Sequence, residues 1–205
     1  MASIVRNTTK KDSPAILTKE KAKDILLQDG MKLDRCVFAL KNDPGIVLIA
    51  VKQNPMALRY ASLRLRGDAE FMSEAIKINV ATFRYATVDL QCVEELVNKV
   101  VAAQGIMLEH ASTELRNSPK TVYTAVSNYG KALQYASKAM RNDQGVVRCA
   151  ISRDCLAVEY ASEQLQNDET IIQFAIDINK QRKHKSLPNS AILEFASPRV
   201  KNKFK

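Results

Sequence analysis

Histidine and cysteine are the residues of this sequence best suited to chemistry, because a cysteine beside a histidine can act as a nucleophile and both can bind zinc. The chain holds two histidines and four cysteines, which are His110, His184, Cys36, Cys92, Cys149 and Cys155. No two cysteines form a C-x-x-C pair, and none has a histidine at zinc-site spacing. The sequence therefore predicts reduced thiols in a cytoplasmic compartment, with no metal site and no cofactor.

Motifs for catalysis or phosphate binding are also absent from the sequence. There is no Gly-rich phosphate loop, no H-E-x-x-H and no G-x-S-x-G, and acidic residues do not recur as pairs. We therefore expect no catalytic residue and no enzymatic activity. One alternative stays open, in which Cys149 or Cys155 is a nucleophile. It predicts that a Cys→Ser change abolishes a measurable activity.

The segments that carry these residues form a tandem repeat. A motif of an aromatic residue or histidine, then alanine, then serine or threonine recurs every 25 residues, and its last copy follows after 35. The copies begin at Tyr60, Tyr85, His110, Tyr135, Tyr160 and Phe195. His110 thus occupies an aromatic slot, which indicates a packing residue rather than a base.

Three apolar columns keep the same register. They are Ala50, Ala75, Val100, Ala125, Ala150 and Ala175, then Leu58, Phe83, Leu108, Leu133, Val158 and Leu193, and then Leu65, Leu90, Leu115, Met140, Leu165 and Val200. Residues 18–42 fit these slots as a degenerate first unit. We expect one repeat domain over 18–202, with units starting near 18, 43, 68, 93, 118, 143 and 168 and an insertion at 180–189. A basic segment, 1–17, precedes it, and a short tail, 203–205, follows.

Each unit is predicted to form two short helices. The first begins at a cap such as Asp43-Pro44, and the second carries Leu58, Ala61 and Leu65 on one face. The second ends at Asn or Gly, residues that tolerate a left-handed C-cap. Because helices of about ten residues are marginal alone, the units must stack. The predicted fold is all-α, a right-handed αα solenoid of about seven 25-residue two-helix repeats.

The repeat signature resembles the short tandem repeats known as domain of unknown function 4116. The best match runs from Thr121 through Tyr135-Ala136-Ser137 to Asn142, and the resemblance covers residues 43–179 well. The resemblance implies short αα repeats of the kind found in secreted effector proteins of intracellular bacteria and in protist proteins. It implies no defined activity, cofactor or set of site residues.

The positive charge of the sequence is concentrated at its ends. The formal charge is +9, residues 1–23 carry six Lys or Arg against two acids, and residues 180–205 carry eight against one. The insertion contributes a candidate anion-binding cluster of Lys180, Arg182, Lys183 and Lys185. This cluster could bind anionic lipid, nucleic acid or an import receptor, or it could be a solvated loop. The near-neutral body argues against nucleic-acid binding along the whole array.

One column varies while its neighbours stay constant. The residue before each aromatic slot is Arg59, Arg84, Glu109, Gln134, Glu159 or Glu194. We interpret this strip as a candidate protein-binding surface, because repeat proteins bind partners through variable side chains on a regular frame. A solvated helix face is the alternative. The aromatic column itself is expected to be a half-buried ladder that links successive units, with a base-stacking platform as its alternative.

These observations favour a non-catalytic protein–protein interaction scaffold, and the resemblance implies a secreted bacterial effector or a regulator of one. The expected partner is another protein, and the alternative is binding of nucleic acid or an anionic membrane through the basic insertion and termini. No stretch approaches the roughly 18 apolar residues of a membrane span, and the N-terminus lacks the apolar core of a secretory signal. We expect a cytoplasmic location, and the resemblance adds delivery into a host cell cytosol.

Overall fold

The computed structural model describes residues 15–181 and 187–204. This part of the chain is helical, with one isolated bridge between Ile16 and Cys36. The chain divides into two compact units, Met1–Tyr85 and Ala86–Lys205, which we call unit 1 and unit 2. The two units are described separately below.

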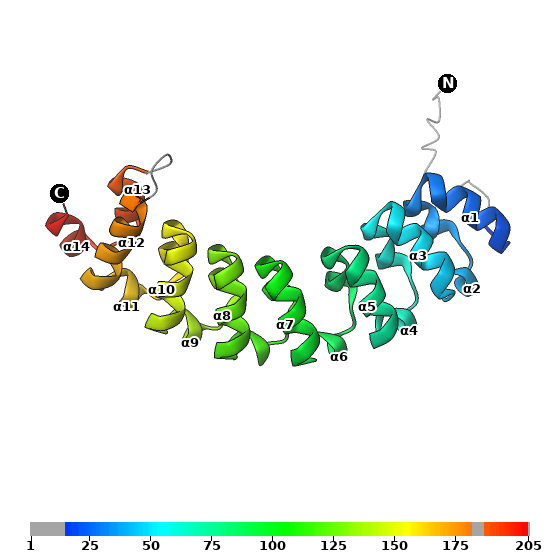
Figure 1. The fold of residues 1–205 in the computed structure, drawn as a ribbon, viewed down its shortest axis with the longest axis horizontal. Coiled ribbons are helices and arrows are strands. Elements are labelled where there is room, and N and C mark those ends of the chain that lie inside the picture. Colours follow the sequence, from blue (N-terminus) through cyan, green and yellow to red (C-terminus); the bar gives the residue numbers. More distant parts are fainter. Residues whose placement is uncertain (1–14, 182–186, 205) are drawn as a thin grey trace, which may run out of the picture. The chain divides into compact units, whose positions relative to one another are not determined.

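Unit 1 repeats three kinds of helical element in a fixed order (Figure 1). A ten-residue α-helix is followed by a six-residue 3₁₀-helix and then by a four-residue α-helix. The elements are α1 (Lys19–Gln28), η1 (Gly30–Arg35), α2 (Phe38–Lys41), α3 (Pro44–Gln53), η2 (Pro55–Tyr60), α4 (Leu63–Arg66), α5 (Ala69–Ile78) and η3 (Val80–Tyr85).

Unit 2 follows the same order with local changes. A short 3₁₀-helix, η5, replaces one short α-helix, and the insertion lengthens α12 to 13 residues. The elements are α6 (Val88–Gln91), α7 (Glu94–Ala103), η4 (Gly105–His110), η5 (Leu115–Asn117), α8 (Pro119–Asn128), η6 (Gly130–Tyr135), α9 (Lys138–Arg141), α10 (Gln144–Arg153), η7 (Cys155–Tyr160), α11 (Glu163–Gln166), α12 (Glu169–Gln181), α13 (Asn189–Leu193) and α14 (Pro198–Lys203).

The long helices begin at the predicted caps. The Asp43 carboxylate accepts a hydrogen bond from the backbone N–H of Ile46 (3.0 Å), and Asp143 accepts one from Val146 (2.9 Å). These bonds satisfy N–H groups that have no partner within the first helical turn. Pro44 and Pro119 stand at the first helical position, where the missing N–H costs nothing.

The prediction of one continuous second helix per unit is wrong. The backbone leaves the helical region at Ala61 (ψ 155°), so that η2 and α4 are separate elements. The Ser62 N–H donates to the backbone oxygen of Lys41 in the preceding repeat (2.9 Å), and its hydroxyl caps α4. Ser112, Ser137 and Ser162 make the same backbone bond one repeat back in unit 2. A bond between repeats therefore replaces a bond within the helix.

The predicted left-handed C-cap is also wrong. Gly67 and Asn142, which end short helices, have φ near −100° (−100° and −102°), and no described residue has a positive φ. The asparagine acts through its side chain instead. Asn117 Oδ1 accepts a hydrogen bond from the hydroxyl of Ser137 in the next repeat (2.6 Å), and Asn142 accepts one from Ser162.

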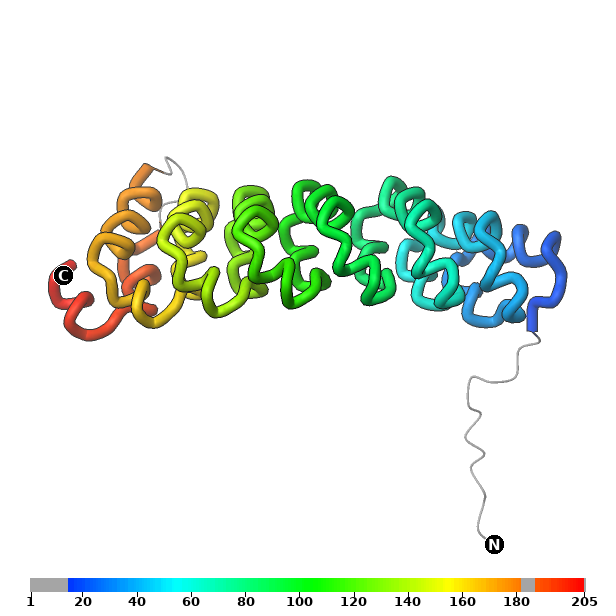
Figure 2. Tube along the Cα trace, turned by 90° about the horizontal axis from the view of Figure 1, so that it is seen from below, coloured from blue at the N-terminus to red at the C-terminus, as the bar shows by residue number. Residues whose placement is uncertain are grey.

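The predicted apolar columns form the core. In unit 1, α1, α3 and α5 pack in one layer and η1, η2 and η3 in a second. In unit 2, the long helices α7, α8, α10 and α12 pack in sequence, as do η4, η6, η7 and α13 (Figures 1 and 2). All members of the three columns are buried, except that Met140 is partly exposed. Each buried leucine contributes about 2 kcal/mol to folding.

Close approach between repeats explains the glycines that begin η4 and η6. A Cβ atom at Gly105 or Gly130 would overlap the carbonyl oxygen of Ala125 or Ala150, on the long helix of the next repeat. The structure shows a stacking contact that leaves no room for a side chain.

Candidate functional site

The four cysteines and His110, the described residues best suited to catalysis, lie on different elements. None of the four cysteines forms a disulfide, and burial raises the pKa of Cys36, which keeps that thiol protonated. The Cys149 Sγ lies 3.1 Å from the hydroxyl of Ser127, and Cys149 raises the pKa of Tyr123. His110 is half-buried at the end of η4, and His184 lies outside the described residues. Among the described residues, no three His, Cys, Asp or Glu side chains converge as a metal site would require.

The six residues of the variable strip are all exposed. Arg59 and Arg84 lie in η2 and η3, and we call them the unit 1 row. The unit 2 row consists of Glu109, Gln134, Glu159 and Glu194, on η4, η6, η7 and the end of α13. Within each unit these elements are neighbours, so the structure brings the row residues of that unit onto one layer. Their role in binding stays a prediction.

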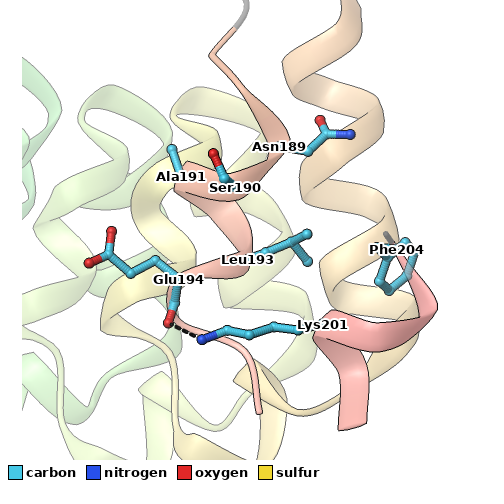
Figure 3. Close-up of a pocket in the computed structure, with 7 residues that line it drawn as sticks. All are labelled: Asn189, Ser190, Ala191, Leu193, Glu194, Lys201 and Phe204. Carbon is cyan, nitrogen blue, oxygen red and sulfur yellow. Dashed lines mark hydrogen bonds between the residues drawn. The ribbon is translucent and has the colours of Figure 1, made fainter. Parts of the chain in front are cut away.

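A side chain seven residues further along fixes the backbone beneath the row. Gln166 Nε2 donates to the backbone oxygen of Glu159 (2.7 Å), and Lys201 Nζ donates to that of Glu194 (3.1 Å; Figure 3). Lys41 Nζ makes the corresponding bond in unit 1. Our sequence reasoning missed this device, although long donors recur in the column Lys41, Arg66, Gln91, Arg116, Arg141, Gln166 and Lys201.

The unit 1 row combines arginine with tyrosine. The Arg59 Cζ lies 4.8 Å from the ring centroid of Tyr60, and the Arg84 Cζ lies 5.8 Å from that of Tyr85. These distances are in the range of cation–π contacts. Both tyrosines are half-buried, as predicted for the aromatic column. The guanidinium groups are thus held over the rings.

The unit 2 row combines carboxylates with tyrosine. Burial, and then the Glu109 carboxylate of the preceding repeat, raises the pKa of Tyr135. Burial, and then the Glu159 carboxylate, raises the pKa of Tyr160. Both directions follow because a buried or anion-flanked phenol resists ionisation. The charge of Glu109 thus acts on the tyrosine of the next repeat, and the role of the aromatic column in linking repeats stays a prediction.

A cavity of about 720 Å³ lies at the end of unit 2, beside the last residue of the unit 2 row (Figure 3). It is lined by Asn189, Ser190, Ala191, Leu193, Glu194, Lys201 and Phe204. In Figure 3 the Leu193 side chain points toward Phe204, while Lys201 reaches the backbone oxygen of Glu194. The lining residues include no histidine or cysteine, so the cavity pairs no nucleophile with an imidazole base.

The candidate anion-binding cluster lies mostly outside the described residues. Lys180 is exposed near the end of α12, whereas Arg182, Lys183 and Lys185 fall within 182–186. The two ends of the insertion are joined by the buried Asn179. Its Nδ2 donates to the backbone oxygen of Leu187 (2.7 Å), and its Oδ1 accepts from the Leu187 N–H (2.9 Å). The sequence did not reveal this clamp.

Comparison with known proteins gives one match. A family model described as Domain of unknown function (DUF4116) matches residues 18–66, 43–91, 94–141 and 143–201. These segments cover most of the chain and coincide with the repeats described above. No curated protein and no solved structure matches the chain.

Proposed function

The chain belongs to the family described as Domain of unknown function (DUF4116), and from that premise we propose that it is a non-catalytic scaffold that binds another protein through its rows. One observation carries the proposal. The exposed column changes from Arg59 and Arg84 to Glu109 and Glu159, while the buried columns around it stay apolar.

The physical basis is that buried positions determine stability, whereas exposed positions have little effect on it. Buried columns supply the free energy that keeps short helices folded, so their side chains are constrained by volume. Exposed single charges contribute little to folding, usually within about 0.5 kcal/mol. The row residues are therefore free to differ between repeats, and a partner can distinguish the resulting patterns of charge.

The proposal includes the finer geometry expected from the repeat, a right-handed solenoid of about seven repeats. Small-angle X-ray scattering tests this part, since a stacked array gives a maximum dimension well beyond that of a globular protein of the same mass. The proposal also includes a cytoplasmic location, with delivery into a host cytosol if the protein acts as an effector. In the described part of the chain, no helix has both the length and the apolar character required to cross a membrane.

Site-specific photo-crosslinking tests the scaffold function. A photoreactive amino acid replaces Gln134 in the unit 2 row, and in the control it replaces Glu95, which is exposed on the long helix α7. We expect a crosslinked protein partner from the row position and a weak signal from the control. Equal crosslinking at both positions, or a turnover that survives purification, contradicts the proposal.

Anion binding through the insertion is the second candidate, because Lys180 is exposed beside the point where Asn179 closes the insertion. It predicts binding to nucleic acid or anionic vesicles that weakens steeply with salt. Neutral substitutions at Lys180, Arg182, Lys183 and Lys185 should abolish it. Partner binding that is insensitive to salt and to these substitutions rejects it.

A further inference from the structure

The two arginines of the unit 1 row are positioned for a ligand but have no carboxylate partner. Among the described residues, no ion pair involves Arg59 or Arg84. Each guanidinium is instead stacked on the tyrosine that follows it, at 4.8 and 5.8 Å from the ring centroids. A stacked guanidinium is partly ordered before binding, so less side-chain freedom is lost when it meets a partner.

The surroundings of the two arginines form one surface. Arg59 and Arg84 hold the same slot in η2 and η3, which pack against each other. A 3₁₀-helix has three residues per turn, so Met56 lies on the same face as Arg59. Met56 is 48% exposed, which is high for a large apolar residue. The surface therefore offers two guanidinium groups and one apolar contact, and the exposed Asp34 holds the same slot on the neighbouring η1.

The stacking favours one class of partner. Bases of single-stranded nucleic acid bind by stacking on aromatic rings. In unit 1, arginine side chains lie over one face of Tyr60 and of Tyr85, which leaves less of each ring for a base. The planar guanidinium stays available, and its parallel N–H groups match the oxygens of a carboxylate or a phosphate, of which an unmodified protein segment carries only the carboxylate.

Deepening the proposed function, on which this step rests, we propose that the Arg59–Arg84 pair binds an extended acidic protein segment whose carboxylates stand three residues apart. The spacing follows from packing, since neighbouring helices lie roughly 8–10 Å apart. A polyproline II segment has three residues per turn and rises about 3.1 Å per residue, which places every third side chain on one side at about 9 Å. A β-strand would place such residues on opposite faces.

Fluorescence anisotropy with the full chain tests this inference. One short peptide carries Glu at every third position in a proline-rich background, and a second has the same composition with its Glu residues in one block. We expect the spaced peptide to bind at low salt and the block peptide to bind at least about threefold more weakly. The variant Arg59→Gln/Arg84→Gln should lose about tenfold in affinity for the spaced peptide, because two charge-assisted contacts disappear.

Two further variants sharpen the result. Arg59→Lys/Arg84→Lys keeps both charges but loses the planar groups, and we expect an intermediate affinity. Lys77→Gln/Arg199→Gln removes two exposed cations elsewhere and should leave the affinity unchanged. Circular dichroism checks that all variants are folded.

Several outcomes would overturn the inference. These are equal binding of both peptides, an equal loss in the control variant, tighter binding of a single-stranded oligonucleotide at the same arginines, or self-association that depends on them. If no acidic peptide binds while photo-crosslinks from the rows to a protein persist, the acidic-segment inference fails and the scaffold function stands. If the crosslinks are also absent, both fail.

Discussion

Unit 1 and unit 2 differ in charge at the same slot of the repeat. In unit 1 the slot holds Asp34 and then Arg59 and Arg84, and the two arginines are each stacked on the following tyrosine. In unit 2 the slot holds Glu109 and Glu159, which lie beside Tyr135 and Tyr160. Burial is the main cause of the raised pKa of each tyrosine hydroxyl, and the neighbouring carboxylate raises that pKa further. The tyrosine column is shared, whereas the charged partner differs. The same buried core therefore presents two surfaces of different charge. Substitutions in the core and in the rows show whether the exposed residues can change without loss of stability.

The largest effect is expected from a glycine that allows the stacking. Gly105→Val places a side chain against the Ala125 carbonyl oxygen and should lower the free energy of unfolding by about 3 kcal/mol or more. Urea denaturation followed by circular dichroism measures it. Gly145→Ala is the control in the same unit, since its Cβ would meet only the Asp143 carboxylate at 3.2 Å. If both substitutions cost the same, the repeats do not approach each other closely at Gly105.

The second effect concerns the side-chain bond between repeats. Asn117→Ala removes the acceptor of the Ser137 hydroxyl and should cost about 1 kcal/mol. Ser112 occupies the matching slot one repeat earlier, but Cys92 replaces the asparagine there, and the Ser112 hydroxyl accepts a hydrogen bond from the Leu115 N–H (3.3 Å). We therefore expect Cys92→Asn to stabilise the protein by a few tenths of a kcal/mol. Thermal unfolding measures the stability of both variants. If Cys92→Asn destabilises the protein, the serine–asparagine hydrogen bond is not a general contact between successive repeats.

The third effect concerns the stabilisation by two helix-capping carboxylates, one in each unit, and its dependence on pH and salt. Both Asp43 in unit 1 and Asp168 in unit 2 cap long helices and have a lowered pKa, chiefly through the hydrogen bond from Lys19 for Asp43 and from Thr170 for Asp168. A lowered folded-state pKa means that the stabilisation is complete above the unfolded value of about 4 and is lost as the pH falls through the folded value.

Because Lys19 and Asp43 form a partly exposed ion pair at 2.7 Å, salt should weaken the unit 1 contribution most. Asp43→Ala should therefore cost about 0.5 kcal/mol less in high salt than in low salt. Asp168→Ala should depend less on salt, because the charge of Arg148 is the smallest cause of the lowered pKa of Asp168. Parallel urea titrations at neutral pH provide the measurement, and equal salt dependence of the two variants would contradict the assignment.

The smallest effect is expected from the rows themselves. Arg84→Gln in unit 1 and Glu159→Gln in unit 2 should each change the free energy of unfolding by less than about 0.5 kcal/mol, because these side chains are exposed. Differential scanning calorimetry checks this. If either substitution lowers the free energy of unfolding several times more than this, the row residue contributes to folding. The row would then have no basis as a recognition surface.

The sequence predicted the core better than the connections. Ala50 and Leu58 could be placed inside because their columns recur at fixed spacing, and volume limits such positions. The break at Ala61 could not be predicted, because Leu58, Ala61 and Leu65 also fit one continuous helix. What breaks the helix is the bond from the Ser62 N–H to Lys41, which lies 21 positions away in the sequence.

The site was predicted only in part, for a related reason. Exposure of the row followed from its variation, and the half-buried tyrosines followed from their place beside the apolar columns. The donors beneath the row and the stacking of Arg59 on Tyr60 depend on side-chain conformation, which the spacing of residues does not specify. The Asn179 clamp likewise joins backbone that the insertion separates in the sequence.

The amide of Asn179 has a consequence for how this chain tolerates change in length. By bonding both the N–H and the C=O of Leu187, it returns the backbone to the position from which the next element starts. Extra residues placed between these two points leave the phase of the following helices intact. This junction is therefore a natural place to graft an epitope, a fluorophore or a tether, whereas a single added residue at Gly130 would misalign every contact downstream of it in unit 2.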